Sequence, residues 1–180
     1  MNAATDVLPR CGAGVVLRRL SGPDIAAFQA YRTDAELGRY QGWAPMTDAK
    51  AREFLDEMHT AELFCPGEWT QIGVAAPDGV ALLGDMGLFL AADSRHAEIG
   101  FTLAWPAQGR GVATAAAREA VALLFEFTAV ERVLGITDAR NGASIRVLER
   151  IGMRKVDERR VVFGGEPCVE CVYAVSRGGA

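Results

Sequence analysis

The chain has 180 residues, half of them hydrophobic, and this length and composition suit one soluble globular domain with a single core. Its net charge of −4, without any run of lysine or arginine, argues against a nucleic-acid-binding surface and against a membrane-surface partner. No hydrophobic stretch reaches the ~20 residues of a membrane span, and the N-terminus lacks a signal-peptide pattern, so the sequence favours a cytoplasmic protein.

The first part of the chain predicts one strand followed by two helices. Residues 14–20 alternate like a strand, and residues 21–24 then begin a helix with Pro23 in its first turn. A loop with two aromatic residues follows at 38–45. Thr47 is a suitable N-cap for the second helix, because its hydroxyl can accept a hydrogen bond from the first turn.

From residue 68 onward the pattern changes to antiparallel strands. Strands at 68–76 and 80–92 are joined by the turn Pro77-Asp78-Gly79, and a third strand is predicted at 95–104. The later elements are a long helix at about 111–127, a strand at 131–139, a short helix at 142–151 and a hairpin closed by Gly164-Gly165. This order predicts a mixed α/β sheet in one domain, covering residues 13–176, with residues 1–12 and 177–180 as flexible ends.

Cys168 and Cys171 form a C-x-x-C pair, a spacing that can indicate a metal or redox site. The surrounding residues alternate like a strand, however, and residues three apart on a strand face opposite sides. No second pair follows, and His59 and His96 are the two histidines of the chain. We therefore predict reduced thiols and no metal.

The segment Gln108-Gly109-Arg110-Gly111-Val112-Ala113 joins the third strand to the long helix. The first N–H groups of a helix have no intrahelical partner and carry the positive end of its dipole. Glycine lets an anion approach the backbone, so the segment suits a phosphate or pyrophosphate, with a turn that merely requires glycine as the alternative. It is neither a P-loop, which needs Gly-Lys-Ser/Thr, nor a Rossmann loop, which needs a third small residue and a βαβ unit.

These six residues match the Q/R-x-x-G-x-G/A signature of the GNAT superfamily of N-acetyltransferases. A later run, NGASIRVLERIGMRK, is similar to the N-x-x-S-x-x-x-L-E-x-x-G-F/M segment of the ribosomal-protein N-terminal acetyltransferases within that superfamily. The resemblance extends to the opening LRRLSGPDIAAF and to the RYQGW loop, and so covers most of the chain. It implies a single-domain GNAT-like fold with a mixed, mostly antiparallel sheet, a splayed central strand pair and flanking helices.

The resemblance also implies acetyl-CoA as the acetyl donor, without a metal. The loop amides would hold the CoA pyrophosphate, pantetheine would fill the splay, and an amide near Leu103 would stabilise the oxyanion. Arg146 is either a phosphate contact or a solvated helix charge. The implied cofactor residues are Phe101, Thr102, Leu103, Ala104, Gln108, Gly109, Arg110, Gly111, Val112, Ala113, Thr114, Asn141 and Arg146.

Glu98 is the candidate general base. Relatives that acetylate histone lysines have a glutamate at the matching strand position, and a carboxylate there could take the proton of the amine directly or through water. Pairing with Arg95 and binding of a cationic acceptor are the alternatives. Many relatives carry a tyrosine as general acid where this chain has Leu148. Ser144 is a candidate for that role, although its position at a helix start also suits capping.

The loops and strand that flank the acceptor in relatives correspond here to the segments of Tyr40, Trp43 and Trp69. Core packing is the alternative for all three, and we favour it for Trp69. The expected acceptor is a protein N-terminal α-amine or a small amine. An aminoglycoside or a polyamine is the alternative, and a non-catalytic acyl-CoA sensor is the alternative of another class. The sequence predicts neither a nucleic-acid nor a membrane partner, and both a monomer and a homodimer stay open.

Overall fold

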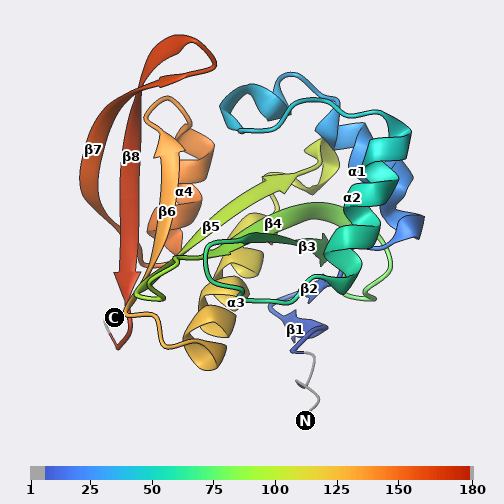
Figure 1. Ribbon diagram of the computed structural model, residues 1–180, viewed down its shortest axis with the longest axis horizontal. Helices are drawn as coiled ribbons and strands as arrows, with labels where there is room; N and C mark the ends of the chain where they lie inside the picture. Colours follow the sequence, from blue (N-terminus) through green and yellow to red (C-terminus); the bar gives the residue numbers. More distant parts are fainter. Residues whose placement is uncertain (1–6, 179–180) are drawn as a thin grey trace.

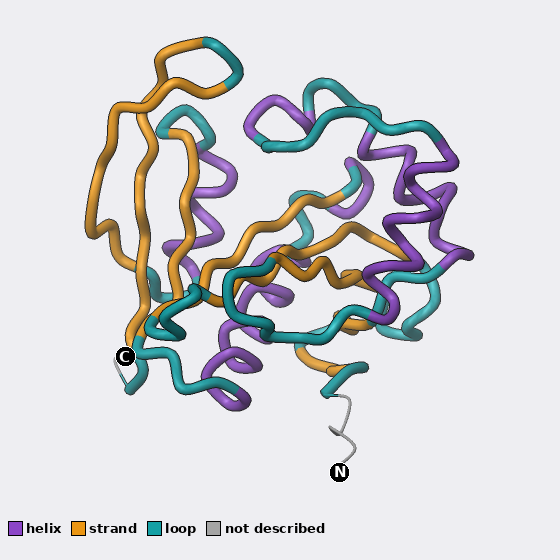
Figure 2. The backbone as a smooth tube through the Cα atoms, in the orientation of Figure 1, coloured by secondary structure: helices purple, strands orange, loops and turns teal. Residues whose placement is uncertain are grey.

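An eight-stranded sheet with helices on both faces forms the frame of the molecule (Figures 1 and 2). The computed structural model describes residues 7–178. The strand order is β1-β2-β3-β4-β5-β6-β8-β7, and only the β5–β6 pair is parallel among the pairings of the described residues. The strands are β1 (Arg10–Gly12), β2 (Val15–Arg18), β3 (Trp69–Ala75), β4 (Leu82–Leu90), β5 (His96–Leu103), β6 (Arg132–Asp138), β7 (Arg154–Phe163) and β8 (Glu166–Ser176).

The helices follow the predicted order along the chain. They are α1 (Ile25–Arg32), α2 (Asp48–Thr60), α3 (Val112–Phe127) and α4 (Gly142–Arg150), with 3-10 turns η1 (Gly22–Asp24), η2 (Leu37–Tyr40) and η3 (Trp105–Ala107). Thr47 caps α2 as predicted, because its side chain accepts a hydrogen bond from the Lys50 N–H. The mixed α/β fold class is confirmed.

The ends of the chain are more ordered than the sequence predicts. Strand β1 pairs with β2, and Arg10 binds Glu119 of α3 at 2.8 Å, so residues 10–12 are not a flexible end. Arg177 likewise donates to three backbone carbonyls at the end of α3 and in the loop after it. Residues 1–6 and 179–180, which the same prediction covers, lie outside the described residues.

Strands β5 and β6 lie side by side over only three residue pairs, from His96–Arg132 to Glu98–Leu134. Beyond Glu98, β5 continues alongside β4 while β6 continues alongside β8, and the two strands diverge (Figure 1). Within the described residues, the edge of β5 that faces β6 therefore has no strand partner from Ile99 to Leu103. This is the splayed central pair that the sequence resemblance implies.

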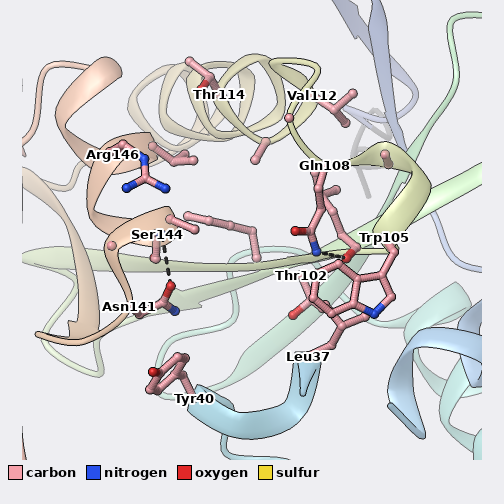
Figure 3. A pocket seen from close by; sticks show the side chains of 18 of the residues that line it. Leu37, Tyr40, Thr102, Trp105, Gln108, Val112, Thr114, Asn141, Ser144 and Arg146 are labelled. Atoms are coloured by element: carbon pink, nitrogen blue, oxygen red, sulfur yellow. Dashed lines mark hydrogen bonds between the residues drawn. The ribbon is translucent and has the colours of Figure 1, made fainter. Parts of the chain in front are cut away.

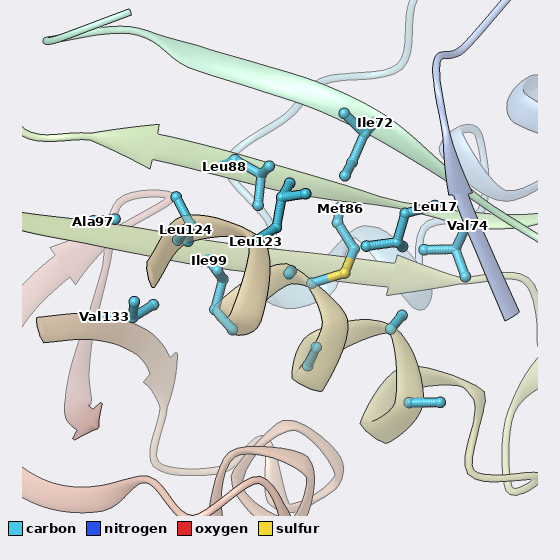
Figure 4. Packing of buried hydrophobic residues seen from close by; sticks show 14 of the residues in the cluster. Leu17, Ile72, Val74, Met86, Leu88, Ala97, Ile99, Leu123, Leu124 and Val133 are labelled. Carbon is cyan, nitrogen blue, oxygen red and sulfur yellow. The ribbon is translucent and has the colours of Figure 1, made fainter. Parts of the chain in front are cut away.

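Helix α3 packs on one face of the sheet and forms the main core (Figure 4). Its buried alanines bring the helix close to the strands, where Ile99, Met86 and Leu88 meet Leu123 and Leu124. Burial of such side chains contributes about 1.5–3 kcal/mol each. Helices α1 and α2 cover part of the other face, around a second cluster that includes Phe28, Tyr31 and Leu55. The sheet is thus covered by helices on both sides, but incompletely on the α1–α2 side.

A buried polar network ties α1 to the sheet. The carboxylate of Asp85 on β4 is 0% exposed and accepts hydrogen bonds from the Tyr31 hydroxyl at 2.6 Å, the Arg32 guanidinium at 2.9 Å and the Gln71 amide at 2.6 Å. Burial and the nearby Asp85 carboxylate raise the pKa of Tyr31 far above its usual value. Trp43 in turn lies over the Arg32 guanidinium, with the ring centroid 4.0 Å away.

Strand β7 ends the sheet and is exposed along most of its length. Six of its ten residues, RKVDERRVVF, are charged. A register shift between Lys155 and Asp157 marks a β-bulge in its pairing with β8. The outer edge of β7 has no strand partner in the described chain.

Cys168 and Cys171 both lie on β8 and are free thiols. Within residues 7–178 no three His, Cys, Asp or Glu side chains gather into a possible metal site. No helix of that same range is long and apolar enough to span a bilayer.

Candidate active site

The N-terminus of α3 presents free backbone N–H groups. Gly109 and Gly111 adopt φ values of 71° and 79°, a left-handed conformation that favours glycine over other residues. Gly111 is the N-cap and supplies no side-chain cap, and the first helical hydrogen bond runs from Ala115 N to Gly111 O. The N–H groups of residues 112–114 consequently have no partner within the helix.

Two glutamine side chains bind the unpaired edge of β5. The Gln108 amide donates to the Leu103 carbonyl at 3.0 Å (Figure 3). The Gln41 amide donates to the Phe101 carbonyl at 3.3 Å. Leu103 and Phe101 thus direct their carbonyls into the gap between β5 and β6. These carbonyls need partners because a buried, unpaired backbone group costs free energy.

A pocket of about 640 Å³ joins the α3 N-terminus to this gap (Figure 3). Ala104 does not line it, and Arg110 lines an adjacent groove instead. Sequence reasoning missed three residues that line the pocket: Gln41 in the RYQGW loop, Trp105 in η3 and Arg140 in the turn before α4. The predicted cofactor residues that do line it are Phe101, Thr102, Leu103, Gln108, Gly109, Gly111, Val112, Ala113, Thr114, Asn141 and Arg146.

The start of α4 closes one side of the pocket. Asn141 caps the helix, because its Oδ1 accepts a hydrogen bond from the Ser144 N–H at 3.1 Å (Figure 3). The sequence offers helix capping as an alternative role for Ser144, but in the structure Asn141 is the capping residue. Ser144 itself lines the pocket. Leu148 is buried against Gly135, where a Cβ would come within 2.4 Å of it, and so belongs to the core.

Arginines without acidic partners surround the α3 N-terminus. Arg110, Arg118 and Arg150 line the adjacent groove, which shares Gly111 with the pocket, and Arg146 and Arg150 line the pocket itself. None of the four has a carboxylate within 4.0 Å in the part of the chain that the structure describes. This region is therefore locally basic in a protein of net charge −4.

Glu98 lies on the sheet face opposite α3, on the same face as Thr102 of the pocket lining, but it does not itself line the pocket. Its side chain is 23% exposed, and His96 Nε2 lies 3.7 Å from its Oε1. Burial raises the pKa of Glu98, while His96 and Arg159 act in the opposite direction. The alternative partner named from the sequence, Arg95, instead approaches Glu131 at 3.5 Å.

The three aromatic residues considered for the acceptor side, Tyr40, Trp43 and Trp69, have different surroundings. Tyr40 lines the pocket, with the guanidinium of Arg140 5.9 Å from its ring centroid. Trp43 does not line it, because its indole lies over Arg32. Trp69 is 50% exposed and lies against Phe89 with ring centroids 5.3 Å apart, so the prediction that Trp69 packs in the core is wrong.

Comparisons with known proteins agree on one family. The sequence matches the family model of the acetyltransferase (GNAT) domain over residues 15–154. A GNAT-family acetyltransferase from Bacillus anthracis has a TM-score of 0.81 at 21% identity, with 92% of this chain and 96% of that chain covered. A comparison with curated protein sequences gives no significant match.

Two further solved structures carry the same fold with ligands. Spermidine N-acetyltransferase from Vibrio cholerae, in complex with CoA and spermine, has a TM-score of 0.75 at 16% identity, with 91% of this chain and 95% of that chain covered. The ribosomal-protein α-N-acetyltransferase RimL, in complex with coenzyme A, has a TM-score of 0.78 at 15% identity, with 93% and 97% covered. At these identities the likeness concerns the fold.

Proposed function

The chain belongs to the GNAT family of acetyl-CoA-dependent N-acetyltransferases, and from this premise we propose that it acetylates the primary amine of a protein N-terminus or of a small molecule. The observation that carries the proposal is the pocket between the free N–H groups of α3 and the gap beside β5. Through Thr102 the pocket reaches the sheet face on which Glu98 lies. The reaction needs a compartment that contains acetyl-CoA, in keeping with the cytoplasmic location that the sequence favours.

The basic end of the pocket would hold the phosphates of acetyl-CoA. Backbone N–H groups at a helix N-terminus bind anions, and the glycines leave the approach open because a Cβ at Gly109 or Gly111 would meet no heavy atom of the described residues within 4 Å. Arg146 and Arg110, which lack acidic partners, would add charge-assisted hydrogen bonds. No metal is needed to neutralise the phosphates in this arrangement.

The unpaired edge of β5 would bind the pantetheine arm. Its amide groups could take the places of the Gln41 and Gln108 amides on the Phe101 and Leu103 carbonyls. An N–H at the same edge, near Leu103, would donate to the thioester oxygen as negative charge develops there. The splay between β5 and β6 thus supplies both the space for the arm and the backbone groups that orient it.

Glu98 would accept the proton of the attacking amine, directly or through one water. The amine nitrogen forms a bond to the acetyl carbon, the carbon–sulfur bond breaks, and CoA leaves as a thiolate that takes a proton from solvent. Leu148 is buried and apolar, so the chain has no acid at the position where many relatives have tyrosine. Ser144 stays the candidate acid within the pocket.

The type of amine decides how much Glu98 has to contribute. A lysine amine has an ordinary pKa of ~10.4, so its deprotonation at pH 7 costs about 4–5 kcal/mol, whereas an α-amine near ~8 costs about 1–1.4 kcal/mol. Because Glu98 is a partly buried carboxylate with His96 as its near neighbour at 3.7 Å, and an amine of low pKa requires the least from such a base, we favour an α-amine or another amine of low pKa.

The test of the donor site is a calorimetric titration with acetyl-CoA. The wild type should bind, and Gly111→Asp should raise Kd by at least about tenfold, because the new carboxylate repels the phosphates. Gly79→Asp is the matched control, since Gly79 has a similar φ of 75° and lies in a remote turn. Both variants carry the same kind of backbone strain, so the site is supported only if the affinity for acetyl-CoA falls in Gly111→Asp and not in Gly79→Asp. A wild type that binds NAD but not CoA contradicts it.

Turnover separates the enzyme from a sensor that only binds acyl-CoA. Release of free thiol should be measured with N-terminal peptides, amino-acid amides, spermidine and an aminoglycoside. We expect amine-dependent thiol release and an acetylated product, with α-amines among the best acceptors. Tight binding of acetyl-CoA without amine-dependent release would support the sensor instead.

A further inference from the structure

The sheet face that carries Glu98 has an ordered set of side chains next to the pocket. Pairing across β3, β4 and β5 aligns its residues in rows, and neighbouring strands are about 4.8 Å apart. The three rows are Trp69–Phe89–Glu98, then Gln71–Gly87–Gly100, then Gly73–Asp85–Thr102. The middle row contains two glycines directly opposite each other, and this is the feature that needs an explanation.

Neither glycine is required by backbone conformation, because neither has a positive φ. Gly87 makes room for the indole of Trp69, whose ring atoms lie 2.9 and 3.0 Å from where a Cβ would be. A Cβ at Gly100, in contrast, would meet no heavy atom of residues 7–178 within 4 Å. Gly100 therefore leaves an open position on the sheet, beside an indole that lies over the neighbouring glycine.

Three groups border this open position. Glu98 and Thr102 precede and follow it on the same face of β5, and Thr102 also lines the donor pocket. Trp69 borders it across Gly87, half-exposed and packed against Phe89 with the ring planes tilted by 31°. An exposed indole on the same sheet face as a carboxylate suits a ligand with an ammonium group and an apolar portion.

The ion pairs on this face leave Glu98 without an arginine partner. The carboxylate of Asp85 is bound by Arg32, and that of Asp157 on β7 by Arg159 at 3.0 Å. Neither Glu98 nor Glu170 of β8 has an arginine nitrogen within 4.0 Å of its carboxylate in the described chain. Of these two carboxylates, Glu98 is the one on β5, next to the open position.

We propose that the open position above Gly100 is the acceptor site and that it takes a primary amine with an apolar or aromatic group beside the amine carbon. The ammonium lies at Glu98 and the apolar group lies against Trp69. This inference rests on the proposed acetyltransferase function and adds to it the class of acceptor and the residue that selects it.

The first test fills the site. Gly100→Val adds a β-branched side chain to a strand position with free space, so the variant should fold with an unchanged or higher Tm. Its KM for phenylalaninamide should rise at least about tenfold, while Kd for acetyl-CoA changes less than twofold. Gly100→Ala should give a smaller rise in the same direction. An unchanged KM in Gly100→Val overturns the site.

The second test removes the indole. Phenylalaninamide and glycinamide are both α-amines and differ by one benzyl group, so their ratio of kcat/KM reports on the apolar contact alone. The wild type should prefer phenylalaninamide about tenfold, Trp69→Ala should abolish that preference, and Trp69→Phe should retain part of it. A preference that survives in Trp69→Ala overturns the assignment of Trp69.

The third test uses spermidine. We expect a lower kcat/KM for spermidine than for phenylalaninamide, because spermidine has no aromatic group to lie against Trp69, and the reverse order overturns the proposed class of acceptor. Two outcomes distinguish a failure of this acceptor site from a failure of the proposed function. Acetylation of amines with no effect of Gly100→Val or Trp69→Ala defeats this inference and leaves the function intact. Absence of acetyl-CoA binding and of transfer to any amine defeats both.

Discussion

Glu98→Gln should lower kcat by about 10²–10⁴-fold, the usual contribution of a positioned general base. Glutamine preserves the size of the side chain but cannot accept the proton of the amine. Kd for acetyl-CoA should hardly change, because Glu98 does not line the donor pocket. Steady-state kinetics at saturating acceptor measures the effect, and Glu131→Gln is the control, since Glu131 is an exposed surface carboxylate near Arg95.

The pH dependence gives a second measure of the same role. Glu98 must be deprotonated to act as base, and burial raises the pKa of Glu98. Activity should therefore fall on acidification at a pH above the ordinary carboxyl value of ~4.3, and this acidic limb of kcat/KM should vanish in Glu98→Gln. A higher acceptor KM with kcat retained would instead make Glu98 a binding group for the ammonium. Unchanged kinetics would remove it from the mechanism.

Asp85→Ala should destabilise the protein by about 3–5 kcal/mol, the range for breaking one side of a buried ion pair. The substitution leaves the Arg32 guanidinium buried without a counter-charge and also removes the acceptor of Tyr31 and Gln71. In a domain of this size, each kcal/mol of lost unfolding free energy lowers Tm by roughly 2–4 °C, so we expect a Tm lower by roughly 6–20 °C. Thermal unfolding followed by circular dichroism measures it.

The matched control is Asp157→Ala, which removes an equally direct carboxylate–arginine pair at the surface. Arg159 and Asp157 are about half-exposed and 3.0 Å apart, and such pairs contribute about 0–1 kcal/mol. Burial is the variable that separates the two variants. If the Tm of Asp85→Ala is as close to that of the wild type as the Tm of Asp157→Ala is, the network around Asp85 does not hold α1 on the sheet.

The donor side of the site could be predicted because its chemistry is local in the chain. Six consecutive residues, from Gln108 to Ala113, contain the glycines with positive φ and the beginning of α3. The strand before them is adjacent in sequence, and the strand order places its edge beside the loop. Alternation along that strand also predicts that Glu98 shares a face with Thr102, as the structure has it.

The proposed acceptor side could be predicted only in part, because it depends on contacts between distant segments. Trp69 and Gly100 come to the same sheet face only through the register of β3, β4 and β5, and a tryptophan in a strand gives no sign of which face is covered. Gln41 reaches Phe101 across sixty residues of chain. Strand β1 is three residues long, too short for alternation to be recognised against the background of a polar terminus.

The charged outer strand bears on how the protein behaves at high concentration. An unpaired strand edge is a template for pairing with another chain, and proteins limit this hazard with charges and bulges along the edge. Strand β7 has both over Arg154–Arg160, where six charges and the bulge occur. The protection ends at Val161, since the remaining residues of the strand are apolar and Val162 is 72% exposed. Self-association under conditions that loosen the hairpin would therefore begin at its tip, and a lysine at position 162 would extend the charged edge to the turn.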